Sequence, residues 1–227
     1  MTILCIETST NCCSAAICRD GIAVASRENL SGANHASELP LFIEQLLAEA
    51  QANTWTLDAV AISQGPGSYT GLRIGTSIAK GLCYGMNIPL IPIDTLQILC
   101  AAITEEVPTD ALLCPMLDAR RMEVYTAMYT SYLEQQTEVM AKVIDEQSFA
   151  EELRDKKIYI FGNGAEKCRS VITSANAYFV EDILPQAKYM GKLADQTMAL
   201  DIKQVAYYEP FYLKEFVPAP SHVKGLK

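Results

Sequence analysis

The hydrophobic pattern of this chain alternates between two periods. Apolar runs of about four to eight residues, bounded by glycine, proline or polar clusters, predict strands, and apolar residues three and four apart predict helices. The predicted strands are residues 2–7, 13–18, 22–28, 59–63, 88–93, 112–117, 122–129, 158–161 and 177–180, and the predicted helices are 37–50, 69–86, one starting at Thr95, 148–155 and 165–175. Asp20-Gly21 is a strong signal for a tight hairpin. A mixed sheet followed by alternating helices and strands indicates the α/β class.

The most informative segment reads Gly65-Pro66-Gly67-Ser68-Tyr69-Thr70-Gly71-Leu72-Arg73-Ile74-Gly75. Gly65 and Gly67 can take backbone angles that are closed to other residues, and Pro66 fixes its own φ. Ser68 stands where a helix N-cap belongs. The first amides of the helix could hold an anion or simply meet this capping hydroxyl. The segment predicts a strand, a tight turn and a helix, and by itself it identifies no ligand.

Small residues recur at every fourth position of this helix, at Gly71, Gly75, Ala79 and Cys83. A glycine inside a helix costs about 1 kcal/mol relative to alanine, so the glycines of this helix require a packing reason. One interpretation is close packing on the protein's own sheet. The other is the close approach of a helix from a partner protein.

Charge and hydropathy limit the partners of the chain. Twenty-seven acidic residues against 18 basic ones give a net charge of −9, and the basic residues are scattered. Because nucleic-acid binding depends first on neutralising phosphates, we expect the chain alone to hold nucleic acid poorly. No segment reaches membrane-spanning length, and no basic leader with an apolar run precedes Glu7. These features predict a cytoplasmic protein without a membrane part.

Cysteine and histidine usage argues against a metal centre. The eight cysteines lie mostly inside apolar segments and none forms Cys-x-x-Cys, so we expect free thiols that pack as small hydrophobic groups. His35 and His222 are the only histidines and form no ligand pair. The chain contains no Gly-x-Ser-x-Gly pattern. A Ser-His-Asp or Cys-His arrangement stays open, with His35 as its base.

Four motifs in this order resemble the TsaB (YeaZ) family. They are residues 3–10, 35–40, 65–75 and 118–125. The resemblance is close over residues 1–130 and looser beyond, where it runs through Gly162-Asn163-Gly164 and Pro210-Phe211-Tyr212-Leu213. Members of the family are bacterial components of the machinery that installs threonylcarbamoyl on adenosine 37 of tRNAs that read A-starting codons.

The resemblance implies a two-lobed fold of the actin, sugar-kinase and Hsp70 (ASKHA) type, with mixed sheets flanked by helices. We expect an N-terminal lobe at residues 1–97, a C-terminal lobe at 98–206 and a segment at 207–227 that returns toward the N-terminal lobe. Periodicity alone does not predict this fold.

The same resemblance implies a non-catalytic scaffold that supports the catalytic subunit TsaD together with the ATPase TsaE. The chain would contact tRNA only indirectly and would form a homodimer through the same helical surface when alone. The implied partner interface comprises Leu39, Ile43, Leu46, Gly71, Leu72, Gly75, Ala79 and Cys83. TsaD carries a His-x-x-x-His pair, whereas here His35 is followed four residues later by Leu39.

A vestigial nucleotide site is a further implication. In ASKHA proteins an acidic residue ends the first strand, and a glycine-containing hairpin approaches the phosphates of ATP. Ser9 stands here where glycine usually allows that approach. The implied residues are Glu7, Thr8, Ser9, Thr10, Gly162 and Gly164. We expect no cofactor in the isolated chain and ATP or ADP only in the complex.

Two other functions stay open. One is an active enzyme of the same superfamily, either a threonylcarbamoyltransferase, a phosphotransferase or a glycoprotease-like peptidase, which would use the cleft between the lobes. The other is a self-contained regulatory homodimer that needs no TsaD.

Overall fold

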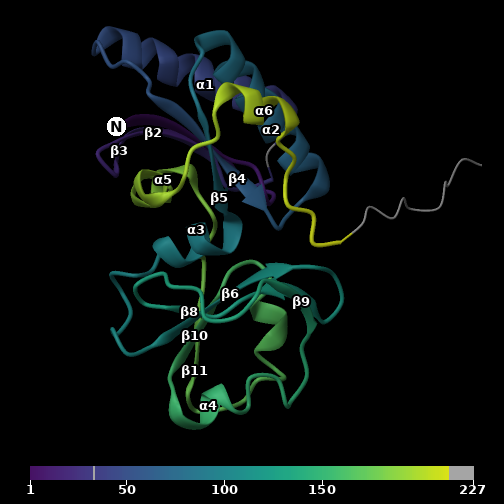
Figure 1. The fold of residues 1–227 in the computed structure, drawn as a ribbon. Helices are drawn as coiled ribbons and strands as arrows, with labels where there is room; N and C mark the ends of the chain where they lie inside the picture. Colours follow the sequence, from purple (N-terminus) through teal and green to yellow (C-terminus); the bar gives the residue numbers. More distant parts are fainter. Residues whose placement is uncertain (33, 215–227) are drawn as a thin grey trace, which may run out of the picture.

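Two β-sheets, one in each lobe, organise the chain in the computed structural model (Figure 1). The structure describes residues 1–32 and 34–214, so His222 and the tail after Pro218 lie outside it. The first sheet contains, in spatial order, β3 (Ile22–Asn29), β2 (Cys13–Arg19), β1 (Thr2–Glu7), β4 (Ala59–Gly65) and β5 (Leu90–Asp94). The second contains β11 (Ala177–Val180), β10 (Ile158–Phe161), β6 (Leu112–Asp118), β7 (Glu123–Thr126) and β9 (Met140–Val143), with β8 (Tyr129–Thr130) paired to β6. Both sheets are mixed, which confirms the predicted fold class.

The central strand of the first sheet is β1, and all of its residues are buried. A nearly continuous apolar run of this kind is typical of a strand that is covered on both faces. β1 pairs antiparallel with β2 and parallel with β4. The φ angles of Asp20 and Gly21 are 50° and 79°, so the predicted tight hairpin forms between β2 and β3.

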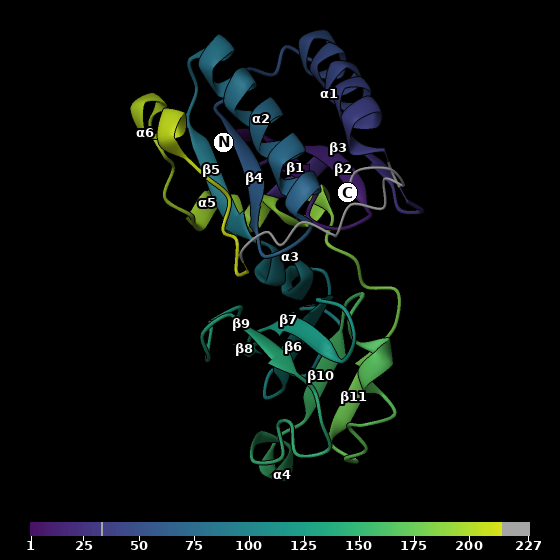
Figure 2. The ribbon, with the colours of Figure 1, turned by 90° about the vertical axis from the view of Figure 1, so that its right-hand side faces the viewer.

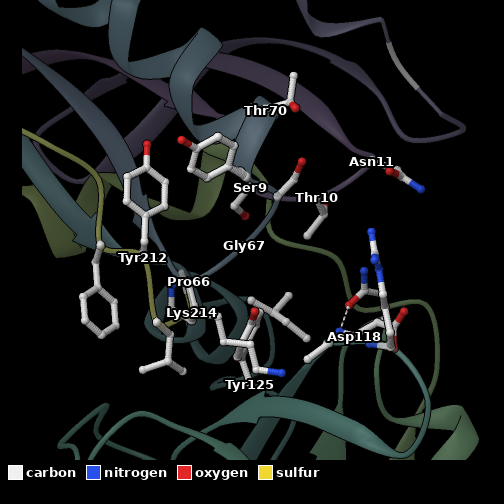
Figure 3. Close-up of a pocket in the computed structure, with 18 residues that line it drawn as sticks. Ser9, Thr10, Asn11, Pro66, Gly67, Thr70, Asp118, Tyr125, Tyr212 and Lys214 are labelled. Carbon is white, nitrogen blue, oxygen red and sulfur yellow. Dashed lines mark hydrogen bonds between the residues drawn. The ribbon is translucent and has the colours of Figure 1, made fainter. Parts of the chain in front are cut away.

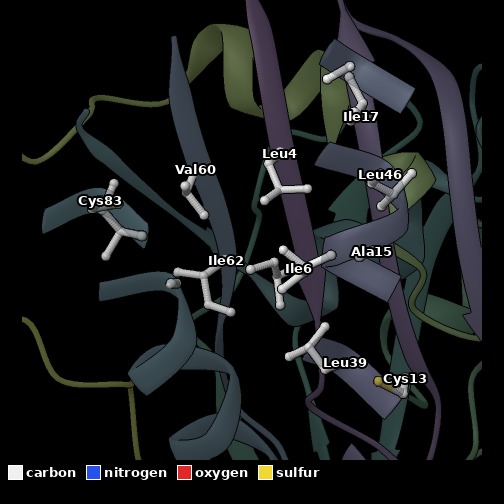
Figure 4. Close-up of a cluster of buried hydrophobic side chains, with 14 of the residues drawn as sticks. Leu4, Ile6, Cys13, Ala15, Ile17, Leu39, Leu46, Val60, Ile62 and Cys83 are labelled. Carbon is white, nitrogen blue, oxygen red and sulfur yellow. The ribbon is translucent and has the colours of Figure 1, made fainter. Parts of the chain in front are cut away.

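Helices cover both faces of the first sheet (Figure 2). One face carries α1 (His35–Ala52), α2 (Tyr69–Met86) and α6 (Ile202–Tyr207), and the other carries α3 (Thr95–Ala101), α5 (Gly191–Gln196) and the short 3-10 turn η2 (Ala187–Tyr189). In Figure 4, Leu4 and Ile6 of β1 lie in the core with Leu39 and Leu46 of α1. α3 also packs on β6 and therefore lies between the lobes. Within the described residues, no helix has both the length and the apolar character to cross a membrane.

The strip of small residues on α2 faces the protein's own sheet, which corrects the predicted partner interface. A Cβ added at Gly71 would lie 2.1 Å from the carbonyl oxygen of Thr8, and one at Gly75 would lie 2.3 Å from the Thr8 hydroxyl. The other six residues assigned to that interface, Leu39, Ile43, Leu46, Leu72, Ala79 and Cys83, are buried as well. These eight residues are core residues of this chain, because the helices α1 and α2 bury their small and apolar sides against β1 and β4.

The second lobe has its own core between the sheet and the segments that follow it. Buried side chains of β6, β10 and the irregular segments around them form this cluster, which includes Cys114, Met116, Ile158 and Ile160. β6 and β7 pair as the predicted hairpin. The short strand β9 was not predicted, and it pairs antiparallel with β7 at the edge of the sheet.

The helix predicted at residues 148–155 is shorter than expected. Phe149 has a φ of 63°, which lies outside the right-handed helical region, so only α4 (Glu152–Asp155) forms. The predicted cap, Ser148, instead donates its hydroxyl to the carboxylate of Asp145 at 2.9 Å. A local side-chain turn therefore replaces the first part of the predicted helix.

The helix predicted at residues 165–175 does not form. The segment contains the 3-10 turn η1 (Glu166–Cys168) and further turns, in which the Val171 amide donates to the Cys168 carbonyl at 3.0 Å. Residues 171–173 are Val, Ile and Thr. Such β-branched side chains lower helix propensity, and here Ile172 serves the core of the second lobe.

The chain returns to the first lobe at Ala187, ahead of residue 207, where the sequence placed the return. Ala187, Met190 and Leu193 are buried on the face of the first sheet that α3 also covers. Leu200 then exchanges two backbone hydrogen bonds with Leu90 of β5. The turn η2, the helix α5 and the segment at Leu200 thus belong to the first lobe. From the sequence, all three were expected in a C-terminal lobe that runs to residue 206.

Candidate functional site

A cavity of about 570 Å³ opens between the two lobes (Figure 3). Five segments that are far apart in the sequence contribute to its walls. They are the β1–β2 turn (Ser9, Thr10, Asn11), the β4–α2 loop (Pro66 to Thr70), the β6–β7 hairpin (Leu117 to Arg120 and Tyr125), Asn163, and the segment from Phe211 to Lys214. The carboxyl ends of β1, β4, β6 and β10 meet here with the N-terminus of α2.

The glycine-bearing loop before α2 packs directly on the β1–β2 turn. The Ser68 amide donates to the Ser9 carbonyl at 2.6 Å, and a Cβ added at Gly67 would lie 2.4 Å from that same oxygen. The Ser68 hydroxyl accepts from the Gly71 amide at 3.3 Å, which confirms the predicted N-cap. The loop therefore needs glycine for close backbone contact within this chain.

Glu7 lies beneath the cavity, fully buried at the end of β1. One carboxylate oxygen accepts from the Ser9 amide at 2.5 Å, and the other has no hydrogen-bond partner among the described residues. Burial raises the pKa of Glu7 to about 7, although the hydrogen bond from the Ser9 amide acts in the opposite direction. The hydroxyls of Thr8 and Ser9 are also buried without a partner among the described residues. This first-strand acid is enclosed, and it does not line the cavity.

The two glycines assigned to a vestigial nucleotide site pack against β6. A Cβ at Gly162 would lie 2.5 Å from the Met116 carbonyl oxygen, and one at Gly164 would lie 2.8 Å from the Leu117 carbonyl carbon. Asn163, between them, lines the cavity and accepts from the Asp118 amide at 3.0 Å. Of the six residues assigned to the nucleotide site, only Ser9 and Thr10 line the cavity.

The β6–β7 hairpin brings charged groups to the opposite wall. Arg120 and Arg121 have φ angles of 73° and 50°, two consecutive left-handed residues in a turn that usually favours asparagine and glycine. The Asp118 carboxylate accepts from the Arg120 amide at 3.1 Å and forms an ion pair with Lys167. Sequence reasoning missed this turn type, because nothing in the pair Arg-Arg signals positive φ.

Within the described residues, His35 belongs to no metal-binding cluster. Its Nε2–H donates to the Cys12 carbonyl at 3.1 Å, so the ring is held by backbone at the start of α1. The described residues contain no group of three or more His, Cys, Asp or Glu side chains placed to hold a metal ion. The eight cysteines are free and buried, as predicted.

The exposed residues of α1 and α2, called the α1–α2 face here, include few charged side chains, while Glu38, Glu49 and Lys80 of the same helices are half-buried. Its exposed residues are Ala36, Ser37, Pro40, Leu41, Glu44, Gln45, Ala48, Gln51, Ala52, Thr70, Arg73, Ser77, Gly81, Tyr84, Gly85 and Met86. Glu44 and Arg73 are the only charged residues in this set. Tyr84 is 81% exposed, and a Cβ added at Gly81 or Gly85 would meet no atom within 4 Å. Internal packing therefore explains Gly71 and Gly75 but not these two glycines.

Comparisons with known proteins agree with one another. The family model TsaD, described as tRNA N6-adenosine threonylcarbamoyltransferase, matches residues 28–158. The tRNA threonylcarbamoyladenosine biosynthesis protein TsaB of Bacillus subtilis is 29% identical over 199 residues, which cover 86% of this chain and 81% of that protein. The protein of the same name from Haemophilus influenzae is 28% identical over 227 residues, which cover 96% and 95%.

Solved structures share the fold. An uncharacterized Pseudomonas aeruginosa protein with similarity to peptidase YEAZ superimposes with a TM-score of 0.79 at 24% identity, covering 94% of this chain and 99% of that one. YeaZ from Pseudomonas aeruginosa gives 0.73 at 24% identity, covering 93% and 99%. The activator of the 2-hydroxyisocaproyl-CoA dehydratase from Clostridium difficile gives 0.50 at 10% identity, covering 96% and 100%. These likenesses place the chain in the ASKHA-type fold.

Proposed function

The chain belongs to the TsaB (YeaZ) family, within the wider group that the TsaD model matches, and we propose that it is a non-catalytic scaffold subunit for tRNA threonylcarbamoyladenosine biosynthesis. It docks a catalytic TsaD-type subunit on the α1–α2 face, with TsaE as a further partner. The observation that carries this proposal is the exposed pair Gly81 and Gly85 on a face whose fully exposed residues include only two charged side chains, Glu44 and Arg73.

The energetics of α2 support a docking surface. Each of the two outward glycines costs about 1 kcal/mol relative to alanine, and among the described residues no atom lies within 4 Å of where a Cβ would stand, so close packing within the described chain does not explain them. A bare helix surface lets a second helix approach closely, and the exposed side chain of Tyr84 offers apolar area on the same part of α2. Depletion of charge is characteristic of interface cores. A chain without TsaD buries the same face in a homodimer.

The cavity chemistry supports a role without catalysis. Its described lining contains no histidine or cysteine, and the one acid that ends β1 is enclosed with a raised pKa. The net charge of −9 disfavours direct tRNA binding, so tRNA contacts this subunit only through its partners. ATP or ADP binds only in the complex. Eight unpaired thiols are in keeping with a cytoplasmic protein.

A variant at Gly81 tests the docking surface. Gly81→Arg places a long charged side chain on the α1–α2 face, where an added Cβ would have open space, so the fold should be retained. We expect association with TsaD to be lost by size-exclusion chromatography while the thermal melt stays normal. Ala150→Arg, at an exposed position on the second lobe, is the matched control and should bind normally.

Unchanged TsaD binding by a folded Gly81→Arg protein would move the docking surface elsewhere. Loss of binding in the Ala150→Arg control as well would mean that added positive charge, and not its position, disrupts the complex. An enzyme that works alone in its cleft would be indifferent to both substitutions.

A further inference from the structure

The segment from Tyr208 to Lys214, called the strap here, leaves α6 and runs along the cavity between the lobes (Figure 3). Its last four residues form part of the cavity lining. The strap has no helix or strand of its own, so its position depends on the contacts that it makes with each lobe. Backbone and aromatic contacts join the strap to the first lobe, and an ion pair joins it to the second lobe.

The first-lobe end of the strap is anchored by several contacts at the base of α2. The Phe211 amide donates to the Gln64 carbonyl at 2.7 Å, and a Cβ on Gly65 would lie 2.4 Å from the Phe211 carbonyl oxygen. The strap backbone therefore lies directly on the bare backbone of Gly65. A neutral backbone hydrogen bond of this kind contributes about 1 kcal/mol, and the close packing adds to it.

Tyr212 reinforces this anchor through side-chain contacts with α2. The centroids of the Tyr212 and Tyr69 rings are 4.9 Å apart, within the range of favourable aromatic pairs. The Arg73 guanidinium lies 4.3 Å from the Tyr69 ring centroid, and its Nε–H donates to the Tyr212 hydroxyl at 3.4 Å. Three side chains thus hold the strap to the first lobe.

Among the described residues, Lys214 makes the charged and aromatic contacts between the strap and the second lobe. Its ammonium group forms an ion pair with Glu123 of β7 and lies 5.8 Å from the ring centroid of Tyr125 on the same strand. The side chains of Lys214 and Glu123 remain 41% and 24% exposed, so water competes for the pair. Ion pairs in such surroundings contribute little to stability and break easily.

We propose that the strap closes the cleft between the lobes, with Lys214 and Glu123 as its releasable fastening. In this structure the strap is fastened to both lobes and forms part of the cavity wall. In the released form the strap stays on α2 and detaches from β7, because the first-lobe anchor is the stronger one. The cavity then opens further on the side of the strap without unfolding of either lobe.

Hydroxyl-radical footprinting of the intact chain, read by mass spectrometry, tests this device. Lys214→Glu places like charges together and should raise the oxidation rates of Tyr125 and Leu213 roughly two- to fivefold, the range that exposed ion pairs support. Tyr69 should keep its rate, because the first-lobe anchor remains closed. The charge swap Lys214→Glu with Glu123→Lys should restore the wild-type pattern.

Two controls make the result decisive. Lys192→Glu, which alters an exposed lysine paired with Glu105 on the first lobe, should leave Tyr125 and Leu213 unchanged. Wild-type protein in about 1 M salt should show the same increase as Lys214→Glu, since salt screens exposed pairs. Unchanged rates at Tyr125 and Leu213 in both the variant and high salt would overturn the proposal, as would an equal rise at Tyr69.

Discussion

Tyr129 of the second lobe donates its hydroxyl hydrogen to the carboxylate of Asp94 in the first lobe, with 3.3 Å between the oxygens. The same carboxylate oxygen caps α3 by accepting from the amides of Leu96 at 2.8 Å and Gln97 at 3.1 Å. Burial raises the pKa of Asp94 to about 6, and these hydrogen bonds act against that rise. A hydrogen bond between the buried Tyr129 and the partly buried Asp94 therefore ties the two lobes together at the start of the helix between them.

Removing this hydroxyl should weaken the link between the lobes. Tyr129→Phe keeps the buried ring and deletes one hydrogen bond to a partly buried carboxylate, so we expect a loss of about 1 kcal/mol in the free energy of unfolding. Urea titration at neutral pH measures it. Tyr132→Phe, at a tyrosine that is 72% exposed, is the control and should change nothing. Equal stability of both variants would mean that the Tyr129–Asp94 bond contributes nothing.

Glu7 should make the protein less stable as pH rises. Its pKa is about 7 in the folded chain against an ordinary 4.5, so between these values the folded state binds a proton that the unfolded state has released. The free energy of unfolding then falls across this window, by an amount on the order of 3 kcal/mol. Asp94, with its raised pKa, contributes in the same direction at lower pH.

Glu7→Gln isolates this effect. The amide keeps the shape of the side chain and cannot ionise, so the variant should be more stable than the wild type at pH 8 and should lose much of the pH dependence between pH 5 and 8. Urea unfolding at both pH values provides the measurement. Glu44→Gln, on the exposed side of α1, should reproduce the wild-type pH profile. A Glu7→Gln profile that also follows the wild type would contradict the enclosed, partly protonated carboxyl.

Two glycines of α2 should respond oppositely to alanine. At Gly75 a methyl group would meet the Thr8 hydroxyl at 2.3 Å and Ile62 at 3.0 Å, so overpacking should cost about 1 to 3 kcal/mol. At Gly81 a methyl group meets nothing within 4 Å, and alanine should stabilise the helix by up to about 1 kcal/mol. Thermal melts of the two isolated variants compare them directly. Destabilisation by Gly81→Ala would indicate a packing role for that position inside the folded chain.

Local chemistry made parts of this fold predictable from sequence. Asp20-Gly21 and Ser68 act through their own backbone neighbours, so the hairpin and the helix cap follow from residues within a few positions. The two-lobed arrangement came from the resemblance of the motifs. Periodicity does not determine which strands pair when they are far apart in the sequence, or how the strands divide between two sheets.

The sequence did not determine which way the small residues of α2 face. Gly71 and Gly75 have the same spacing whether they face a partner or the sheet, and only the position of Thr8 at the end of β1 decides between the two. The outward glycines, Gly81 and Gly85, were visible in the sequence too. They stood out only after the structure had placed Gly71 and Gly75 in the core, because internal packing then explained one pair of glycines and not the other.

Lys214 was not connected with the cavity, and Asn163 was named only within the Gly162-Asn163-Gly164 motif, for a related reason. Asn163 and Lys214 lie on segments whose positions depend on the packing of β10 and on the return of the chain to the first lobe. Neither segment has a periodic pattern that predicts its contacts. Phe149, with its positive φ, likewise broke a predicted helix without any glycine to signal it.

The central claim is that this subunit supports modification without performing it. The most direct measurement is threonylcarbamoyladenosine formation on tRNA from threonylcarbamoyl-adenylate, with the purified chain alone, with TsaD and TsaE alone, and with all three together. We predict product only when TsaD is present, and much more of it when this chain is added. Modification of tRNA by the chain in the absence of TsaD would contradict the claim, and so would full activity of TsaD and TsaE without this chain.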